Sequence, residues 1–265
     1  MTYTGNINKM KTEMEETVKY YLPIGESIID MNQLIGKEIS IIYKNQINCI
    51  ACNKKTKTSF FQGYCFNCYN TLPQADISII QPEKDRSFLG ESRDMQWSEQ
   101  NTLIPHYVYM ALSGGLKVGV TREKNIPYRW IDQGANKAIL IAQTPNRHIA
   151  GIIEVLLKEK YSDKTNWRKM LTGNENGFDL VEEKENALNY LNNELKQYAS
   201  SNNSIININY PIKNYPEKVK SIGLEKNNIV EGILKGIKGQ YLIFEDNTVI
   251  NIRKHSGYLV DLIVK

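Results

Sequence analysis

The sequence has no apolar run that approaches the roughly 20 residues needed to cross a bilayer. Its first 20 residues are polar and of mixed charge, so they lack the apolar stretch of a signal peptide. Cysteine is also scarce, with four residues that all lie between positions 49 and 68. These absences predict a cytoplasmic protein without a membrane partner, whose cysteines bind metal rather than form disulfides.

Internal repeats and low-complexity tracts are absent as well, and 265 residues are enough for two or three modules. Composition shifts and turn-forming residues divide the chain into six predicted parts. They are an N-terminal β segment at 1–48, a cysteine module at 49–75, a connector at 76–105, a central domain at 106–172, a helical linker at 173–204 and a C-terminal β domain at 205–265.

The cysteines form two Cys-x-x-Cys pairs that are separated by twelve residues: Cys49, Cys52, Cys65 and Cys68. Each pair can place two thiolates on one ion, and the spacer lets the second pair complete a tetrahedron. Four unrelated thiols or a redox pair would be the alternative, but the paired spacing favours one zinc ion in a ribbon or knuckle module. Because cysteine fills all four positions, we expect this zinc to be structural.

Positive charge is concentrated in two central segments. Residues 106–170 carry eleven Lys or Arg and five Asp or Glu, a net charge of +6, whereas the whole chain has +4. Such a concentration attracts phosphate backbones, although a solvated surface would carry it too. The loop between the cysteine pairs adds three candidate nucleic-acid contacts: Lys54, Lys55 and Lys57.

The central domain has the most regular pattern, which predicts the order β-β-α-β-α. Two strands at 107–112 and 116–121 flank a Ser-Gly-Gly turn, and a short helix at 128–133 ends at Gly134. A third strand at 138–142 precedes a helix that Thr144 is expected to cap. The expected apolar face of that helix is Ile149, Ile152, Ile153, Leu156 and Leu157.

The remaining segments predict an α+β protein with β-rich ends. An amphipathic helix is expected at 178–199, with Val181, Leu188, Leu191 and Leu195 on one side. Short strands are expected at 18–23, 38–43, 229–234, 241–244, 249–252 and 258–264. Because neither end is large alone, we expect the two ends to pair with each other in a small barrel or sheet.

The central domain resembles the GIY-YIG nucleases over about 65 residues. The paired strands Tyr107-Val-Tyr109 and Leu116-Lys-Val-Gly119-Val-Thr-Arg122 are similar to the two motifs that name this family. The resemblance implies a role for each of four matched positions. Tyr109 would help to position the attacking water, Gly119 would be the glycine of the second motif, Arg129 would contact the scissile phosphate, and Glu154 would hold Mg²⁺ or Mn²⁺.

One position departs from this pattern, because Lys117 replaces the second-motif tyrosine that is often considered the general base. A lysine is protonated at neutral pH unless its pKa is lowered, so Lys117 is expected to bind phosphate instead. His106 or Tyr107 on the neighbouring strand are then the candidate bases. A polar residue that often follows the arginine helix is Gln133, which does not titrate.

The whole chain resembles an uncharacterised bacterial family of unknown function. The resemblance rests on the cysteine module, the segments 129–135 and 165–168, and the tail segment 236–244. It implies no activity, so three functions stay open. The first is metal-dependent cleavage of DNA or RNA by Tyr109, Arg129 and Glu154, with Lys117 on phosphate. The second is nucleic-acid binding without catalysis, through Lys117, Arg122, Arg129 and the cysteine loop. The third is a protein-interaction scaffold.

Overall fold

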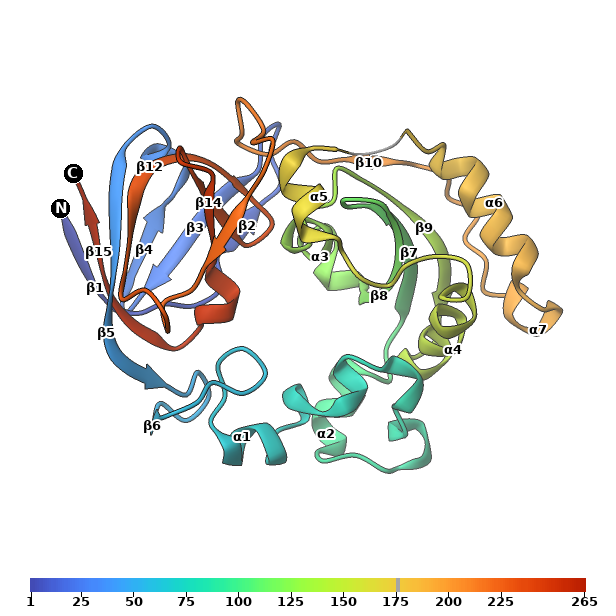
Figure 1. The fold of residues 1–265 in the computed structure, drawn as a ribbon. Helices are drawn as coiled ribbons and strands as arrows, with labels where there is room; N and C mark the ends of the chain where they lie inside the picture. The colour runs from blue at the N-terminus through green and yellow to red at the C-terminus, as the bar shows by residue number, and fades with distance from the viewer. Residues whose placement is uncertain (175–176) are drawn as a thin grey trace. The chain divides into compact units, whose positions relative to one another are not determined.

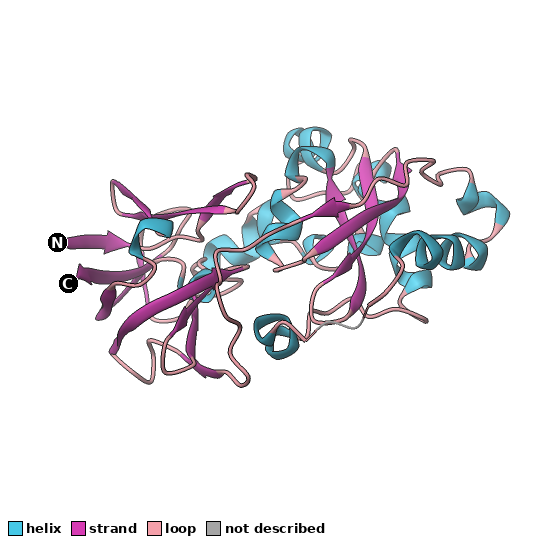
Figure 2. Cartoon of the chain, turned by 90° about the horizontal axis from the view of Figure 1, so that it is seen from above, coloured by secondary structure: helices cyan, strands magenta, loops and turns pink. Residues whose placement is uncertain are grey.

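The computed structural model describes residues 1–174 and 177–265, which divide into two compact units. Unit 1 joins Met1–Asn70 to Asn209–Lys265, and unit 2 comprises Thr71–Ile208. Unit 1 is rich in strands, whereas unit 2 combines a sheet with helices (Figures 1 and 2). The mixed α+β class expected from the sequence is confirmed.

The large sheet of unit 1 has the strand order β1-β15-β5-β12-β13-β14-β11, with β6 paired to β5. Its strands are β1 (Thr2–Asn6), β5 (Glu38–Asn48), β6 (Lys55–Thr56), β11 (Lys220–Ile222), β12 (Ile229–Lys238), β13 (Tyr241–Phe244), β14 (Thr248–Asn251) and β15 (Tyr258–Val264). A second sheet holds β2 (Lys11–Glu13), β3 (Lys19–Ile24) and β4 (Ser27–Asp30). Short 3-10 helices lie at Asn32–Leu34 and Ile252–His255.

The two ends of the chain share the large sheet, as expected. β5 lies between β15 and β12, and the two termini meet where β1 pairs with β15 (Figure 1). Ile41 of β5 is opposite Leu262 on one side and Val230 on the other, and all three side chains are buried. Such cross-strand apolar pairs stabilise a sheet. No strand pairing among residues 1–174 and 177–265 joins β1 to β11, so the sheet is open and the alternative of a closed barrel is wrong.

Unit 2 is built on an antiparallel sheet with the order β10-β9-β7-β8. The strands are β7 (His106–Leu112), β8 (Leu116–Arg122), β9 (Lys137–Thr144) and β10 (Ile206–Asn207). With α3 (Tyr128–Asp132) before β9 and α4 (Arg147–Leu157) after it, the predicted order β-β-α-β-α is confirmed. Gly114 and Gly115 make the turn between β7 and β8 with φ of +65° and +139°, which glycine adopts readily.

Helices cover both faces of this sheet. Val108 and Met110 of β7 pack in one apolar core with α4 and with α6 (Leu180–Tyr190). Side chains alternate along a strand, so Tyr109 points the other way, where its ring packs edge-on against Trp130 of α3 at 5.8 Å between centroids. On that side α5 (Trp167–Thr172) lies against the hairpin turn, because a Cβ on Gly114 would be 2.6 Å from the Met170 nitrogen.

Two helix boundaries differ from the prediction. The side chain of Asn146, not Thr144, caps α4 by accepting a hydrogen bond of 3.0 Å from the Ile149 nitrogen. The helix expected at 178–199 is two helices, α6 and α7 (Asn193–Lys196), since Leu191 is extended and Asn192 caps a new start. In both places the side chain of an asparagine accepts a backbone hydrogen bond and so marks the start of a helix.

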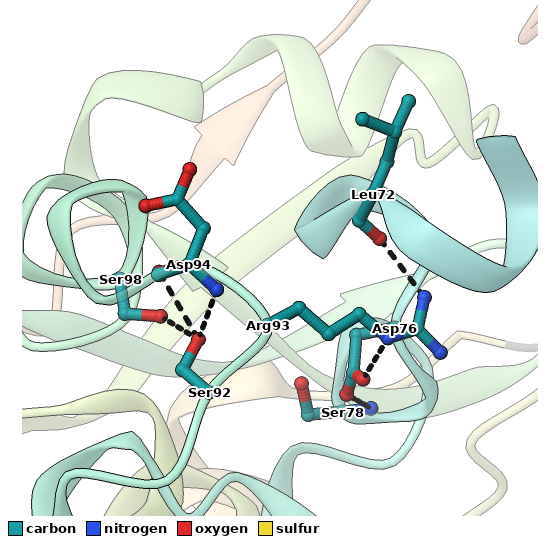
Figure 3. Close-up of polar contacts among 7 residues, drawn as sticks. All are labelled: Leu72, Asp76, Ser78, Ser92, Arg93, Asp94 and Ser98. Atoms are coloured by element: carbon teal, nitrogen blue, oxygen red, sulfur yellow. Dashed lines mark hydrogen bonds and ion pairs between the residues drawn. The ribbon is translucent and has the colours of Figure 1, made fainter.

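The segment expected to be an irregular connector is organised by side-chain contacts. It contains 3-10 helices at Ile77–Ile79, Pro82–Lys84 and Ser87–Leu89, and then α2 (Met95–Asn101), and a further 3-10 helix at Pro73–Ala75 precedes it. Figure 3 shows Arg93 between Asp76, to which it is ion-paired at 3.0 Å, and the carbonyl of Leu72, to which it donates at 3.0 Å. In the same view the Ser92 and Ser98 hydroxyls are hydrogen-bonded at 2.6 Å. This segment is therefore fixed within unit 2.

Substitution of Gly151 by alanine should destabilise unit 2. A Cβ on Gly151 would be 2.2 Å from the nitrogen of Glu83, so α4 would have to move away from the 3-10 helix Pro82–Lys84. We expect a loss of about 1–3 kcal/mol in the free energy of unfolding, measured by chemical denaturation. The matched control is Gly177→Ala, where no atom lies within 4 Å of the added Cβ. Equal stability of both variants would contradict this packing.

Candidate functional site

The four cysteines come together in unit 1 at the end of β5. After Asn48, the Cys49 nitrogen donates to the Lys54 carbonyl at 2.9 Å and the Asn53 nitrogen donates back to the Cys49 carbonyl at 2.8 Å, which closes the first knuckle. The second knuckle leads into α1 (Phe66–Thr71), after Gly63 with φ of +135°. A Cβ on that glycine would be 2.8 Å from the side chain of Ile50, so the two knuckles touch through this residue pair.

The sulfur atoms are close enough to bind one metal ion. All four lie within 4.8 Å of one another, and the Sγ atoms of Cys52 and Cys65 are 3.8 Å apart. Two thiolates at 2.3 Å from a tetrahedral zinc ion would be separated by about 3.8 Å. The predicted metal cluster is thus confirmed in its position, and its donor set fits zinc.

The electrostatics of the cluster also favour a bound cation. Burial raises the pKa of Cys49, but backbone N–H groups of Cys52 and Cys65 outweigh burial and hold this pKa at about 6. The pKa of Cys68 is raised to about 12, by burial and then by its cysteine neighbours. The negative charge of one thiolate therefore makes it harder to ionise the next thiol. A bound divalent cation would offset this repulsion.

A second cluster lies in unit 2, where the residues matched to the GIY-YIG pattern meet. Tyr109 comes from β7, Lys117 from β8, Arg129 from α3 and Glu154 from α4. Arg129 and Glu154 both shift the pKa of Tyr109, and both shift the pKa of Lys117. The structure therefore brings together the four residues that the sequence predicted to act together.

Tyr109 is completely buried and faces the glycine of the second motif. It is opposite Gly119 in the register of β7 and β8, and a Cβ on Gly119 would be 2.6 Å from the tyrosine oxygen. The hydroxyl donates to Oε1 of Gln133 at 2.6 Å. Burial raises the pKa of Tyr109, and the positive charge of Arg129 opposes that rise. Glycine at position 119 is thus required by the close approach of the ring.

Lys117 is 3% exposed, and its Nζ is 3.5 Å from Oγ1 of Thr165. Burial lowers its pKa to about 8, and the charge of Arg129 acts in the same direction. Desolvation disfavours the ammonium form, so this pKa lies closer to neutral than that of an ordinary lysine, although the protonated form still predominates at pH 7. Near neutral pH this side chain can exchange a proton.

Glu154 is 7% exposed, and its environment is cationic. Its Oε2 is 3.5 Å from Nζ of Lys158, which is also 3.5 Å from Oδ2 of Asp163. These are ion pairs, and Oε2 accepts no hydrogen bond within the described part of the chain. Burial raises the pKa of Glu154, while Lys158 and then Arg147 and Arg129 lower it.

The other predicted nucleic-acid contacts are divided between the two units. Lys54, Lys55 and Lys57 are exposed in unit 1, beside the cysteines. Arg122 is in unit 2, where its guanidinium donates to the side chain of Asn101 and burial lowers its pKa.

The two alternative bases are poorly suited to that role. His106 is completely buried, its Nδ1 is 2.8 Å from the Ile104 carbonyl, and burial lowers its pKa to about 4. The hydroxyl of Tyr107 is 3.5 Å from Glu123, and burial raises its pKa.

Sequence reasoning overlooked two members of the unit 2 cluster, Lys158 and Asp163. The i, i+4 spacing of Glu154 and Lys158 on one helix could have indicated their ion pair. Arg147 was also overlooked as a buried residue; its guanidinium donates to the carbonyls of Ser78 and Ile79 at 2.9 and 2.7 Å.

Both clusters lie in the part of the chain that matches a known family. A family described as a protein of unknown function (DUF2797) matches residues 36–260. The chain belongs to this family. The expected membership in a family of unknown function is thus confirmed, while the likeness to GIY-YIG nucleases stays a prediction. No curated protein and no solved structure matches the chain. Within residues 1–174 and 177–265, no helix has the length and apolar character needed to cross a membrane.

Proposed function

We propose that this DUF2797 protein processes nucleic acid, and that residues 106–172 form a GIY-YIG-like domain that cleaves a phosphodiester bond with a divalent metal ion. We further propose that the four cysteines hold a structural zinc ion. One observation carries the proposal: residues matched to the nuclease pattern come from four separate elements, and their ionisable groups act on one another.

Two cations of this cluster would bind the substrate phosphate. The guanidinium of Arg129 offers several donors, and its Nε has no hydrogen-bond partner in the described residues. Lys117 becomes the second cation when it takes the proton of the attacking water, in surroundings where water is largely excluded. Together they would stabilise the negative charge that develops on the phosphoryl oxygens.

Lys117 would act as the general base that accepts the proton of the attacking water. Because the pKa of Lys117 is about 8, a substantial fraction of its amine is neutral at slightly alkaline pH, as a general base requires. Tyr109 would orient the water, because its hydroxyl donates to Gln133 and its oxygen keeps lone pairs that can accept a hydrogen bond. Cleavage should therefore accelerate as the pH rises through about 8.

The divalent ion, Mg²⁺ or Mn²⁺, would be held by Glu154. Its buried Oε2 accepts no hydrogen bond in the described chain, and a carboxylate is the hard ligand that these ions prefer. Asp163 supplies a second carboxylate on the other side of the Lys158 ammonium. When bound, the ion would add positive charge beside the phosphate.

Cleavage assays with purified protein test this proposal. Single-stranded, double-stranded and branched DNA and RNA are incubated with Mg²⁺ or Mn²⁺. Glu154→Ala should lower the rate about 100-fold or more, because a charge-stabilising group is lost. Glu182→Ala, at an exposed position of α6, is the matched control and should cleave like the wild type. If wild type and Glu154→Ala release the same products at the same rate, the enzyme assignment fails.

The second candidate is a catalytically silent nucleic-acid-binding protein. The observation in its favour is that the Lys158 ammonium already pairs with both carboxylates, in the place where a divalent ion would bind. The complete burial of Tyr109 also favours the catalytically silent candidate. Nucleic-acid binding that is independent of divalent metal, without cleavage, would support this candidate over the first.

A further inference from the structure

A cleft of about 780 Å³ lies in unit 2 beside the first residue of β8. Three aromatic side chains line it, together with one lysine and two asparagines: Tyr161, Phe178, Tyr190, Lys160, Asn186 and Asn189. None of these residues belongs to the charged cluster around Glu154. A pocket that combines ring faces with a few polar groups is typical of a site for a planar, polar ligand.

Hydrogen bonds hold two of the rings in place. The Tyr161 hydroxyl donates to the Glu183 carboxylate at 3.2 Å, and the Tyr190 hydroxyl donates to the carboxylate of Glu159. Both hydroxyls are therefore hydrogen-bonded within the protein, so the two rings are oriented before a ligand binds. Preorganised walls reduce the entropy that binding would otherwise cost.

The polar groups of the cleft suit the edge of a nucleobase. One face of α6 carries Glu183, Asn186 and Tyr190 at the spacing i, i+3, i+7. The carboxamides of Asn186 and Asn189 each offer both a donor and an acceptor. Nζ of Lys160 is 4.2 Å from the centroid of the Tyr190 ring. This cation covers one face of the ring, so a base that stacks there has to displace the ammonium, which a neighbouring phosphate can then bind.

The cleft and the charged cluster share one segment of chain. Ser162, which lines the cleft, accepts a hydrogen bond of 2.8 Å from the nitrogen of Val118 in β8. Three residues later, Thr165 contacts Nζ of Lys117. Leu116, also in the wall of the cleft, directly precedes Lys117. Leu116 and Lys117 point to opposite faces of β8, an edge strand of the sheet, so a nucleic-acid strand with a base in the cleft would pass around this edge to bring a phosphate to Lys117.

We propose that this cleft binds an unpaired nucleobase, so that the substrate is single-stranded or locally unpaired nucleic acid. The inference rests on the proposed function and adds the substrate class to it. Every nucleobase has a face that stacks on tyrosine or phenylalanine, and its edge can bond to asparagine. A base inside a duplex is stacked between its neighbours and does not offer these surfaces.

Fluorescence anisotropy with labelled oligonucleotides tests this inference, using the full chain, a single-stranded probe and a duplex of the same sequence. Wild type should bind the single strand more tightly. Tyr190→Ala should weaken that binding about tenfold or more and remove the preference, because one stacking face is lost. Tyr190→Phe is the matched control, since it keeps the ring. Asn189→Ala, at an exposed position, tests the cleft without a change to the core.

The outcomes separate this inference from the proposed function. Equal affinity for single strand and duplex, or unchanged single-strand binding in both Tyr190→Ala and Asn189→Ala, would overturn the base-binding cleft and leave the nuclease proposal standing. Failure of the wild type to bind any nucleic acid would overturn both. Thermal unfolding of each variant identifies a loss of binding that comes from misfolding, and only folded variants count.

Discussion

Replacement of Cys68 by serine should release the metal ion and unfold the segment that follows β5. Cys68 is buried, and three other sulfur atoms surround it within 4.8 Å. Structural zinc contributes about 10–16 kcal/mol of apparent binding free energy, which a small module without much apolar mass needs in order to fold. Metal content should fall from one zinc per chain to nearly none, and amide hydrogen exchange in residues 49–70 should become fast.

Lys57→Ala is the control for this experiment, because Lys57 is exposed in the same loop and is not a ligand. It should keep one zinc per chain and the slow exchange of the wild type. Unit 2 should keep its exchange pattern in both variants, since Thr71–Ile208 has its own core. Wild-type protein that carries far less than one zinc when freshly prepared would contradict the assignment of the metal.

Replacement of Lys117 by methionine should stabilise the protein while it abolishes the proposed cleavage. The pKa of Lys117 falls from 10.5 to about 8 on folding, first because of burial and then because of Arg129. Between these pH values the unfolded chain binds more protons than the folded one, so the free energy of unfolding rises with pH in that window. Below pH 8 the buried ammonium costs about 3 kcal/mol, which methionine at the same length avoids.

Urea denaturation of wild type and Lys117→Met at several pH values measures this effect. At pH 7 the variant should be more stable by about 3 kcal/mol, and the difference should shrink as the pH rises from about 8 toward 10.5. Lys226→Met, at an exposed position of unit 1, should show no such pH dependence. A Lys117→Met variant that is less stable than wild type at pH 7 would mean that the ammonium is a net stabilising partner of Glu154 and Asp163.

The sequence predicted best where a local pattern and a packing requirement coincide. Two Cys-x-x-Cys pairs with one spacer leave few arrangements, and the four sulfur atoms do meet. Strand-forming runs on both sides of Gly114 and Gly115 predicted β7 and β8 within one residue at each end. The resemblance to the GIY-YIG order of elements led us to expect that Tyr109 and Arg129 would lie close together.

The remaining features depend on contacts between distant parts of the chain. A closed barrel and an open sheet have the same strand pattern, and the absence of a pairing between β1 and β11 among the described residues separates them. The low pKa of Lys117 comes from burial that no local pattern reveals. Lys158 and Asp163 escaped notice because the bend after α4 brings them together. The aromatic cleft likewise needs α6 beside the segment that follows α4.

Binding of a single-stranded oligonucleotide at increasing salt tests the central claim most directly, because both candidate functions require it. The account predicts an affinity that falls steeply with salt concentration, as phosphate contacts demand, and that is much weaker in Arg129→Gln than in Lys226→Gln. If wild type fails to bind at low salt, or if Arg129→Gln binds with the affinity and salt dependence of wild type, then the cluster around Arg129 does not handle phosphate.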